Sequence, residues 1–125
     1  MKYLLDVNAL ISLLHATHQQ HATAFAWATG KDLVLCPISE LGFLRISSHP
    51  RGLRQAVADA ELAVGQFKKE ARVSFIPDDL SADALGAPSS DSVTDTYLAK
   101  LAGRHSLRLA TFDQGIKHPA VELIV

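Results

Sequence analysis

The stretch Lys2-Tyr3-Leu4-Leu5-Asp6-Val7-Asn8 starts as a short apolar run and ends at a carboxylate. A continuous apolar run of this length is typical of a strand that is covered on both faces of a sheet. Open parallel sheets bind their ligands outside the carboxyl ends of their strands. The stretch therefore predicts an α/β fold with Asp6 at the edge of the sheet where a ligand would bind.

The rest of the chain repeats this alternation of strands and helices. Short apolar runs predict five strands, and helical spacing predicts six helices between them. Because strands separated by helices pair most simply in parallel, we expect a three-layer α/β/α sandwich around a central, mainly parallel five-stranded sheet. The turns are too short to be linkers, so residues 1–125 form one domain. The expected strands are 2–5, 33–36, 73–76, 107–110 and 121–124, and the expected helices are 9–15, 21–28, 38–46, 53–69, 80–85 and 93–104.

Composition describes an ordinary globular protein. Hydrophobic residues make up 48% of the 125 residues and the formal net charge is −1. These values exclude a disordered chain, and they mean that an RNA substrate would have to be attracted by a local cluster of basic residues. The single cysteine, Cys36, cannot form an intramolecular disulfide and reads as a small buried hydrophobe. With no apolar run long enough for a signal peptide or a membrane span, we expect a cytoplasmic protein that does not bind membranes.

Three further acids occupy positions comparable to that of Asp6. Glu40 opens the helix after the second strand, Asp95 lies in the first turn of the helix at 93–104, and Asp113 follows the fourth strand. The predicted topology places Asp6, Glu40 and Asp113 at one edge of the sheet, and the helix that carries Asp95 is expected to point its start toward the same edge. Carboxylates gathered in this way repel one another, so the pattern predicts a site for Mg²⁺ or Mn²⁺.

Each acid also has a structural interpretation. Asp6 could cap the helix that begins near Asn8, Glu40 and Asp95 could interact with the positive ends of their helix dipoles, and Asp113 could be a turn residue. Asp91, one turn before Asp95, could be an auxiliary acid or a helix cap. Four such coincidences in register at one edge are less probable than a functional cluster.

Four motifs, in order along the whole chain, resemble the PIN-domain ribonucleases, specifically the VapC toxins of bacterial toxin-antitoxin pairs. They are 5–10 (LDVNAL), 39–45 (SELGFLR), 93–99 (VTDTYLA) and 110–113 (ATFD). A departure occurs at Ser48-His49-Pro50, where many similar chains carry Thr-Asn-Pro; it affects the shape of a loop and not the acidic positions.

The resemblance implies a function and a set of roles. Asp6, Glu40, Asp95 and Asp113 would hold one or two Mg²⁺ (or Mn²⁺) ions, with Asn8 and Thr111 as supporting polar residues. The reaction would be endonucleolytic cleavage of structured RNA, tRNA or rRNA, by two-metal phosphodiester hydrolysis. The resemblance also implies a homodimer and a cognate VapB-type antitoxin, bound near the first two helices. Core packing is the plainer interpretation of the apolar residues of those helices, which are Leu13, Leu14, Phe25 and Trp27.

Two groups of cationic residues have open interpretations. Arg45, Arg51 and Arg54 are possible RNA contacts, although solvated positions, or for Arg45 a salt bridge, would explain them equally well. The denser basic group Lys68, Lys69 and Arg72 is interpreted as the exposed end of a helix.

Three histidines and two rival functions complete the alternatives. His15, His18 and His21 recur every three residues and could bind Zn²⁺, but polar packing or RNA contact is the simpler explanation. An aspartyl phosphotransfer enzyme would need a second Asp at Asn8 and a Lys after a later strand, and Lys117 comes too late for that role. The remaining alternative is a catalytically degenerate PIN-fold module that binds RNA or protein.

Overall fold

A computed structural model describes residues 1–125 and contains one five-stranded sheet. Every neighbouring pair of strands is parallel, and the strand order is β3-β2-β1-β4-β5. The predicted parallel sheet is therefore confirmed, with β1 at its centre. The strands are β1 (Lys2–Leu5), β2 (Asp32–Leu35), β3 (Ser74–Phe75), β4 (Arg108–Thr111) and β5 (Val121–Leu123).

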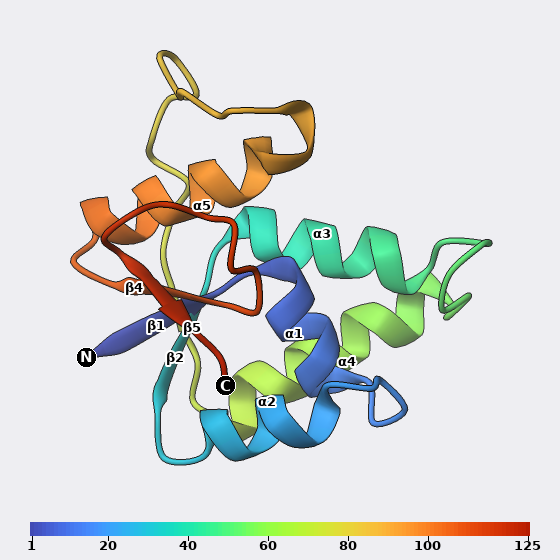
Figure 1. Cartoon of the computed structure of the whole chain (residues 1–125). Helices are drawn as coiled ribbons and strands as arrows, with labels where there is room; N and C mark the ends of the chain where they lie inside the picture. Colours follow the sequence, from blue (N-terminus) through green and yellow to red (C-terminus); the bar gives the residue numbers. More distant parts are fainter.

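Five α-helices and one short 3₁₀ helix connect the strands (Figure 1). The helices α2 and α5 have the bounds that helical spacing predicted, and α1 and α3 differ by one or two residues. None of the helices has the length and apolar character that crossing a bilayer requires. The helices are α1 (Val7–Leu14), α2 (His21–Ala28), α3 (Pro37–Ser47), α4 (Val57–Glu70), the 3₁₀ helix η1 (Ser90–Ser92) and α5 (Val93–Arg104).

One predicted helix, 80–85, is absent, and another begins later than predicted, for reasons visible in the backbone. The segment 80–85 is irregular, because Ala84 adopts a φ of 56° and the Tyr97 hydroxyl takes up the carbonyl of Leu80 at 2.8 Å. The helix predicted from residue 53 begins at Val57, because Arg54 has a φ of 57°. A left-handed residue interrupts an α-helix, so neither stretch can continue one.

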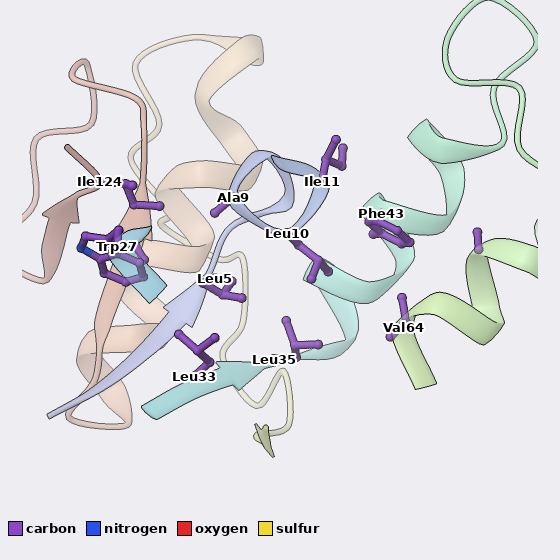
Figure 2. Packing of buried hydrophobic residues seen from close by; sticks show 12 residues of the cluster. Leu5, Ala9, Leu10, Ile11, Trp27, Leu33, Leu35, Phe43, Val64 and Ile124 are labelled. Atoms are coloured by element: carbon purple, nitrogen blue, oxygen red, sulfur yellow. The ribbon is translucent and has the colours of Figure 1, made fainter. Parts of the chain in front are cut away.

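The two faces of the sheet are covered by different helices, as Figure 1 shows. Alternate strand residues point to opposite faces. Leu4 packs in a cluster with Leu98 and Leu101 of α5, whereas Leu5 packs in a second cluster with Leu10 of α1 and Phe43 of α3. Figure 2 shows the second cluster, to which α2 and α4 also contribute. The helix α5 forms one outer layer and α1 to α4 form the other, which confirms the three-layer sandwich.

Close contacts at the start of α3 fix its position against the central strand. Ser39, fully buried, donates its hydroxyl to the carbonyl of Leu5 at 2.7 Å. Gly42 lies so close to Val7 that a Cβ on Gly42 would overlap the Val7 Cγ2 methyl. Cys36 is buried beside these residues as a free thiol, as expected. These contacts hold the starts of α1 and α3 together at the carboxyl edge of the sheet.

Candidate active site

The candidate site lies where the strand order reverses. The chain runs from β1 outward to β2 and β3, then returns to place β4 on the other side of β1. In open α/β sheets the crevice beyond the carboxyl ends of the strands at such a reversal is the usual ligand site. Asp6 directly follows β1, and Asp113 comes two residues after β4. The topology thus brings these two acids to the same crevice, as predicted.

Asp6 is the most buried acid, with 2% of its surface exposed. It is also the N-cap of α1, since one carboxylate oxygen accepts the Ala9 N–H at 2.7 Å. Burial raises the pKa of Asp6 to about 6, while hydrogen bonds from Thr111 and Ala9 act in the opposite direction and the charges of Asp95 and Asp113 add to the increase. Asp6 therefore caps α1 and also lies in a cluster of carboxylates. Burial and the neighbouring charges of this cluster both disfavour the charged form of Asp6.

Asp95 and Asp113 complete this group. Asp95 is half-buried in the first turn of α5, and burial first, then the charge of Asp113, raises its pKa. Asp113 Oδ1 accepts the Gly115 N–H at 2.7 Å, which confirms its role in a turn. The Asp113 N–H donates to Thr111 Oγ1 at 3.0 Å. Thr111, fully buried, thereby contacts both Asp6 and Asp113 and positions one acid relative to the other.

Glu40 does not join the three aspartates. Its carboxylate lies 2.7 Å from Lys68 Nζ of α4, and it lines a separate cavity with Leu44 and Val64. No three His, Cys, Asp or Glu side chains are arranged closely enough to hold a metal ion as they stand. The structure thus brings three of the four expected acids within electrostatic range of one another and directs the fourth toward α4.

The donor set of the three aspartates nevertheless fits a hard divalent cation. Carboxylate oxygens are the ligands that Mg²⁺ and Mn²⁺ prefer. Asp6, Asp95 and Asp113 form no ion pair with any Lys, Arg or His of the chain, and two of them have raised pKa values. A bound cation would favour the charged carboxylates, which burial first and the neighbouring acids second disfavour.

A cavity of about 350 Å³ opens beside this group, between the starts of α1 and α5 and one face of α3. Asn8 and Asp95 line it together with Asp91 and Arg45. Asn8 is exposed, so its amide is free to meet a ligand. The predicted supporting residues therefore occupy two places, with Asn8 on the cavity wall and Thr111 buried behind the acids.

Two of the three basic residues predicted as RNA contacts, Arg45 and Arg51, line cavities on this side of the molecule. Arg45 lines the cavity described above, and it shares a second cavity, of about 420 Å³, with His49 and Arg51. Arg45, Arg51 and Arg54 are exposed and form no salt bridge, so the proposed salt bridge of Arg45 is not observed.

Sequence reasoning missed a second basic group on the far side of α5. Lys100, Lys117 and His118 line a cavity of about 710 Å³ that also reaches Asp113. A signal for Lys117 was present, since it follows Asp113 by four residues in the same turn region. Lys100 lies in the second half of α5. The direction in which its side chain points depends on how α5 packs against the sheet, which the sequence alone does not show.

The three histidines pack between helices and do not form a metal site. His15 Nε2 is 2.9 Å from Ser47 Oγ, and the His15 ring stacks on Phe43 at 5.5 Å. His21 Nδ1 is 2.9 Å from the carbonyl of Ser12. The polar packing interpretation is therefore confirmed, and no His cluster suitable for Zn²⁺ is present.

The apolar residues of α1 and α2 divide into two groups. Trp27 belongs to the core, as expected, but Phe25 is 62% exposed, so core packing was the wrong interpretation for Phe25. Phe25 lines an apolar groove of about 460 Å³ together with Leu14 of α1 and Phe67 of α4. The groove lies between three helices, and none of Asp6, Asp95 and Asp113 lines it.

Comparison with known proteins identifies the family. The PIN domain family model matches residues 3–122. Ribonuclease VapC38 of Mycobacterium tuberculosis (strain H37Rv) is 36% identical over 121 residues, covering 90% of this chain and 86% of VapC38. Ribonuclease VapC44 of M. tuberculosis (strain CDC 1551 / Oshkosh) is 37% identical over 132 residues, covering 97% and 92%. The chain belongs to the PIN domain family, with VapC ribonucleases among its relatives, which confirms the resemblance of the four motifs.

A solved structure supports the same fold at much lower sequence similarity. VapBC2 from Rickettsia felis, bound to a DNA fragment from their promoter, has a TM-score of 0.64 to this chain and covers 98% of it and 97% of the solved chain. The two chains are 13% identical. The likeness therefore concerns the arrangement of strands and helices.

Proposed function

We propose that the protein is an endoribonuclease of the VapC type, the toxin of a toxin-antitoxin pair, and that it cleaves structured RNA such as tRNA or rRNA with Mg²⁺ or Mn²⁺. The observation that carries the proposal is the group formed by Asp6, Asp95 and Asp113 at the reversal of strand order. Membership of the PIN domain family and the ribonuclease relatives supply the class of reaction.

In this proposal the chain's own residues hold and orient the reacting groups. Asp6, Asp95 and Asp113 would bind the cation, and Thr111 would keep Asp6 and Asp113 in place. A bound Mg²⁺ would stabilise the charge that develops on the phosphate and activate water, as divalent ions do in phosphodiester hydrolysis. Asn8 would donate its amide to a phosphate oxygen from the cavity wall. No side-chain nucleophile is needed.

Glu40 has a conditional role in the same proposal. Its carboxylate is paired with Lys68, so it would orient water or help to hold a second ion only after that pair opens. In this proposal the pair keeps Glu40 apart from the other acids until a cation or substrate displaces Lys68.

A VapB-type antitoxin is the proposed protein partner. The apolar groove lined by Leu14, Phe25 and Phe67 is the kind of surface that receives an amphipathic helix. A relative of the same fold was solved as VapBC2. The homodimer and the cytoplasmic location remain predictions from the sequence.

One observation favours the alternative of a catalytically degenerate module. Glu40 is neutralised by Lys68, and no three acidic side chains are preassembled as an ion site. A module of this kind would bind RNA or protein without cutting it.

An assay on the full chain separates the two functions. Purified protein is incubated with end-labelled tRNA and rRNA in Mg²⁺, in Mn²⁺ or in EDTA, and the products are resolved on a sequencing gel. We expect cleavage that needs the cation and that falls by about 100-fold or more in Asp6→Asn, Asp95→Asn and Asp113→Asn. Asp59→Asn is the matched control, because Asp59 is an exposed acid in the first turn of α4.

Calorimetry supplies the second readout. Titration of Mg²⁺ should give a binding heat with the wild type and with Asp59→Asn, and none with Asp6→Asn. Equal RNA binding with and without the cation, no cleavage and no heat would instead establish the degenerate module.

A further inference from the structure

The three aspartates of the candidate site offer a cation fewer free oxygens than their number suggests. One carboxylate oxygen of Asp6 accepts the Ala9 N–H, and one of Asp113 accepts the Gly115 N–H, both at 2.7 Å. Because Mg²⁺ prefers a complete octahedral shell of oxygen ligands, a further carboxylate beside these residues would strengthen the site.

Glu40, the fourth acid expected from the sequence, is not available to the other three. Its Oε2 lies 2.7 Å from Lys68 Nζ, and Lys68 is held from a second side by the Phe75 ring, 4.9 Å from its centre. The cavity that Glu40 lines, between α3 and α4, contains none of the three aspartates. A fourth carboxylate therefore has to come from another part of the chain.

Asp91 is the acid that shares cavity walls with this group. It lines the cavity of about 350 Å³ together with Asp95 and Asn8, and it lines the cavity of about 710 Å³ together with Asp113. In each of the two cavities Asp91 is the only further acid. Asp91 therefore borders the surroundings of Asp95 and also those of Asp113.

The structural interpretation of Asp91 as a helix cap is not observed. Ser89 caps the 3₁₀ helix η1: its N–H donates to Ser92 Oγ at 3.2 Å, and Ser92 Oγ donates to the Ser89 carbonyl at 3.0 Å. The N-cap position of α5 belongs to Ser92. The salt bridges of the chain involve other acids. Neither capping nor ion pairing therefore explains Asp91, whose side chain is exposed.

The backbone nevertheless holds Asp91 close to Asp95. The helix η1 leads directly into α5, and the bonds between Ser89 and Ser92 fix the turn that carries Asp91. Asp91 precedes Asp95 by four residues, which is about one helical turn. Because the Asp91 side chain takes part in no salt bridge or capping bond, its rotation toward a cation would break none.

From these observations we propose that Asp91 supplies the fourth carboxylate of the cation site, directly or through a bound water, in place of Glu40. The inference rests on the proposed function, and it replaces one of the four acids that the family resemblance implies. Asp6, Asp95 and Asp113 remain the other ligands. Glu40 and Lys68 then form a neutral pair between α3 and α4.

Calorimetric titration of Mg²⁺ into the full chain tests this assignment without relying on cleavage. The variants are Asp91→Asn, the conservative Asp91→Glu, Glu40→Gln and Asp83→Asn. Asp83 is an exposed acid in the segment before η1 and lines neither cavity. Asp83→Asn therefore makes the same change in net charge as Asp91→Asn, outside the site.

We expect Asp91→Asn to weaken Mg²⁺ binding by about tenfold or more, as the loss of a residue that completes or orients a metal site commonly does. Asp83→Asn should bind as the wild type does, and Asp91→Glu should recover a large part of the affinity. While Lys68 is intact, Glu40→Gln should lose far less affinity than Asp91→Asn. In EDTA the urea midpoint of Asp91→Asn should be no lower than that of the wild type, because the side chain is exposed.

The two proposals fail in different ways. If Asp6→Asn abolishes the binding heat but Asp91→Asn binds Mg²⁺ as tightly as the wild type, the role of Asp91 is overturned and the proposed function stands. Equal losses in Asp91→Asn and Asp83→Asn would show an effect of net charge alone and would also overturn it. A greater loss in Glu40→Gln than in Asp91→Asn would return the role to Glu40. No heat with the wild type would overturn both proposals.

Discussion

Lys68 Nζ lies 2.7 Å from Glu40 Oε2 and 4.9 Å from the centre of the Phe75 ring. One ammonium group therefore links α3, α4 and β3. Exposure of the two charged side chains is 34% for Lys68 and 22% for Glu40, so solvent screens the pair only in part. The link directs the Glu40 carboxylate toward α4.

Breaking this link should change stability only slightly and should free Glu40. In a double-mutant cycle of Glu40→Gln and Lys68→Met, we expect a coupling energy of up to about 1 kcal/mol in urea unfolding, as for other partly exposed pairs. We also expect Lys68→Met to bind Mg²⁺ more tightly in calorimetry, since Glu40 then has no competing cation. Lys69→Met, at an exposed neighbouring position, is the control. Mg²⁺ binding by Lys68→Met that is no tighter than that by Lys69→Met would contradict the role of the pair in withholding Glu40.

Asp6 should make stability depend on pH in the absence of metal. Its folded pKa of about 6 lies above the ordinary value of 3.8, so the folded protein keeps its proton while the unfolded chain releases it. Stability is thus highest when Asp6 is protonated, falls as the pH rises from about 4 to 6, and stays lower by roughly 3 kcal/mol above that range.

Asp6→Asn should remove this penalty and keep the cap. Asparagine caps helices as well as aspartate does, so the bond to the Ala9 N–H survives. In EDTA near neutral pH we expect Asp6→Asn to be more stable than the wild type by about 1 to 3 kcal/mol, with little difference near pH 4. Asp6→Ala, which lacks the cap, should gain about 1 kcal/mol less. Denaturation of the three proteins at both pH values checks this, and a large loss of stability in Asp6→Asn would mean that the charge itself is structural.

His15 should contribute a pH dependence of the opposite direction. Burial first, and then the charge of His18, lowers the pKa of His15 below its ordinary value. The folded state therefore disfavours the protonated ring, and the stability that the neutral ring provides is lost as the pH falls below the ordinary value of 6.5 and through the lower folded pKa. Between about pH 7.5 and 5.5, we expect the free energy of unfolding to decrease less for His15→Gln than for the wild type. His49→Gln, at an exposed position, is the control, and identical drops in wild type and His15→Gln would contradict the assignment.

The sequence was sufficient to predict the order of the elements and the edge that carries the acids. Apolar runs identify buried strands, and a parallel sheet then places every strand end on one side. Asp6 and Asp113 could be located in this way because Asp6 directly follows β1 and Asp113 comes two residues after β4. The failure at 80–85 arose because nothing in the residue type of Ala84 signals the left-handed conformation that excludes a helix there.

The direction of individual side chains could not be predicted from spacing. Glu40 is at the expected edge, yet its carboxylate faces Lys68, which is 28 residues away in the chain. Phe25 is a large apolar residue of the kind that usually packs in a core, but its side chain in α2 is exposed. Both outcomes depend on how helices pack against each other across the layer, and periodicity within one helix holds no information on that contact.

Gly42 is predicted to control the approach of α1 to α3. A Cβ at this position would overlap the Cγ2 methyl of Val7, a stiff β-branched side chain one residue from Asp6. Gly42→Ala should therefore cost about 1 to 3 kcal/mol, more than the helix propensity of alanine returns, and should reduce the binding of Mg²⁺ by shifting the start of α1. Gly65→Ala is the matched control, because a Cβ on Gly65 in α4 meets open space and should stabilise by about 0.5 to 1 kcal/mol. Val7→Ala/Gly42→Ala should recover most of the loss seen in urea unfolding, since the clashing methyl is gone. If Gly42→Ala is stabilised as much as Gly65→Ala, the contact between Val7 and Gly42 does not set the position of the site.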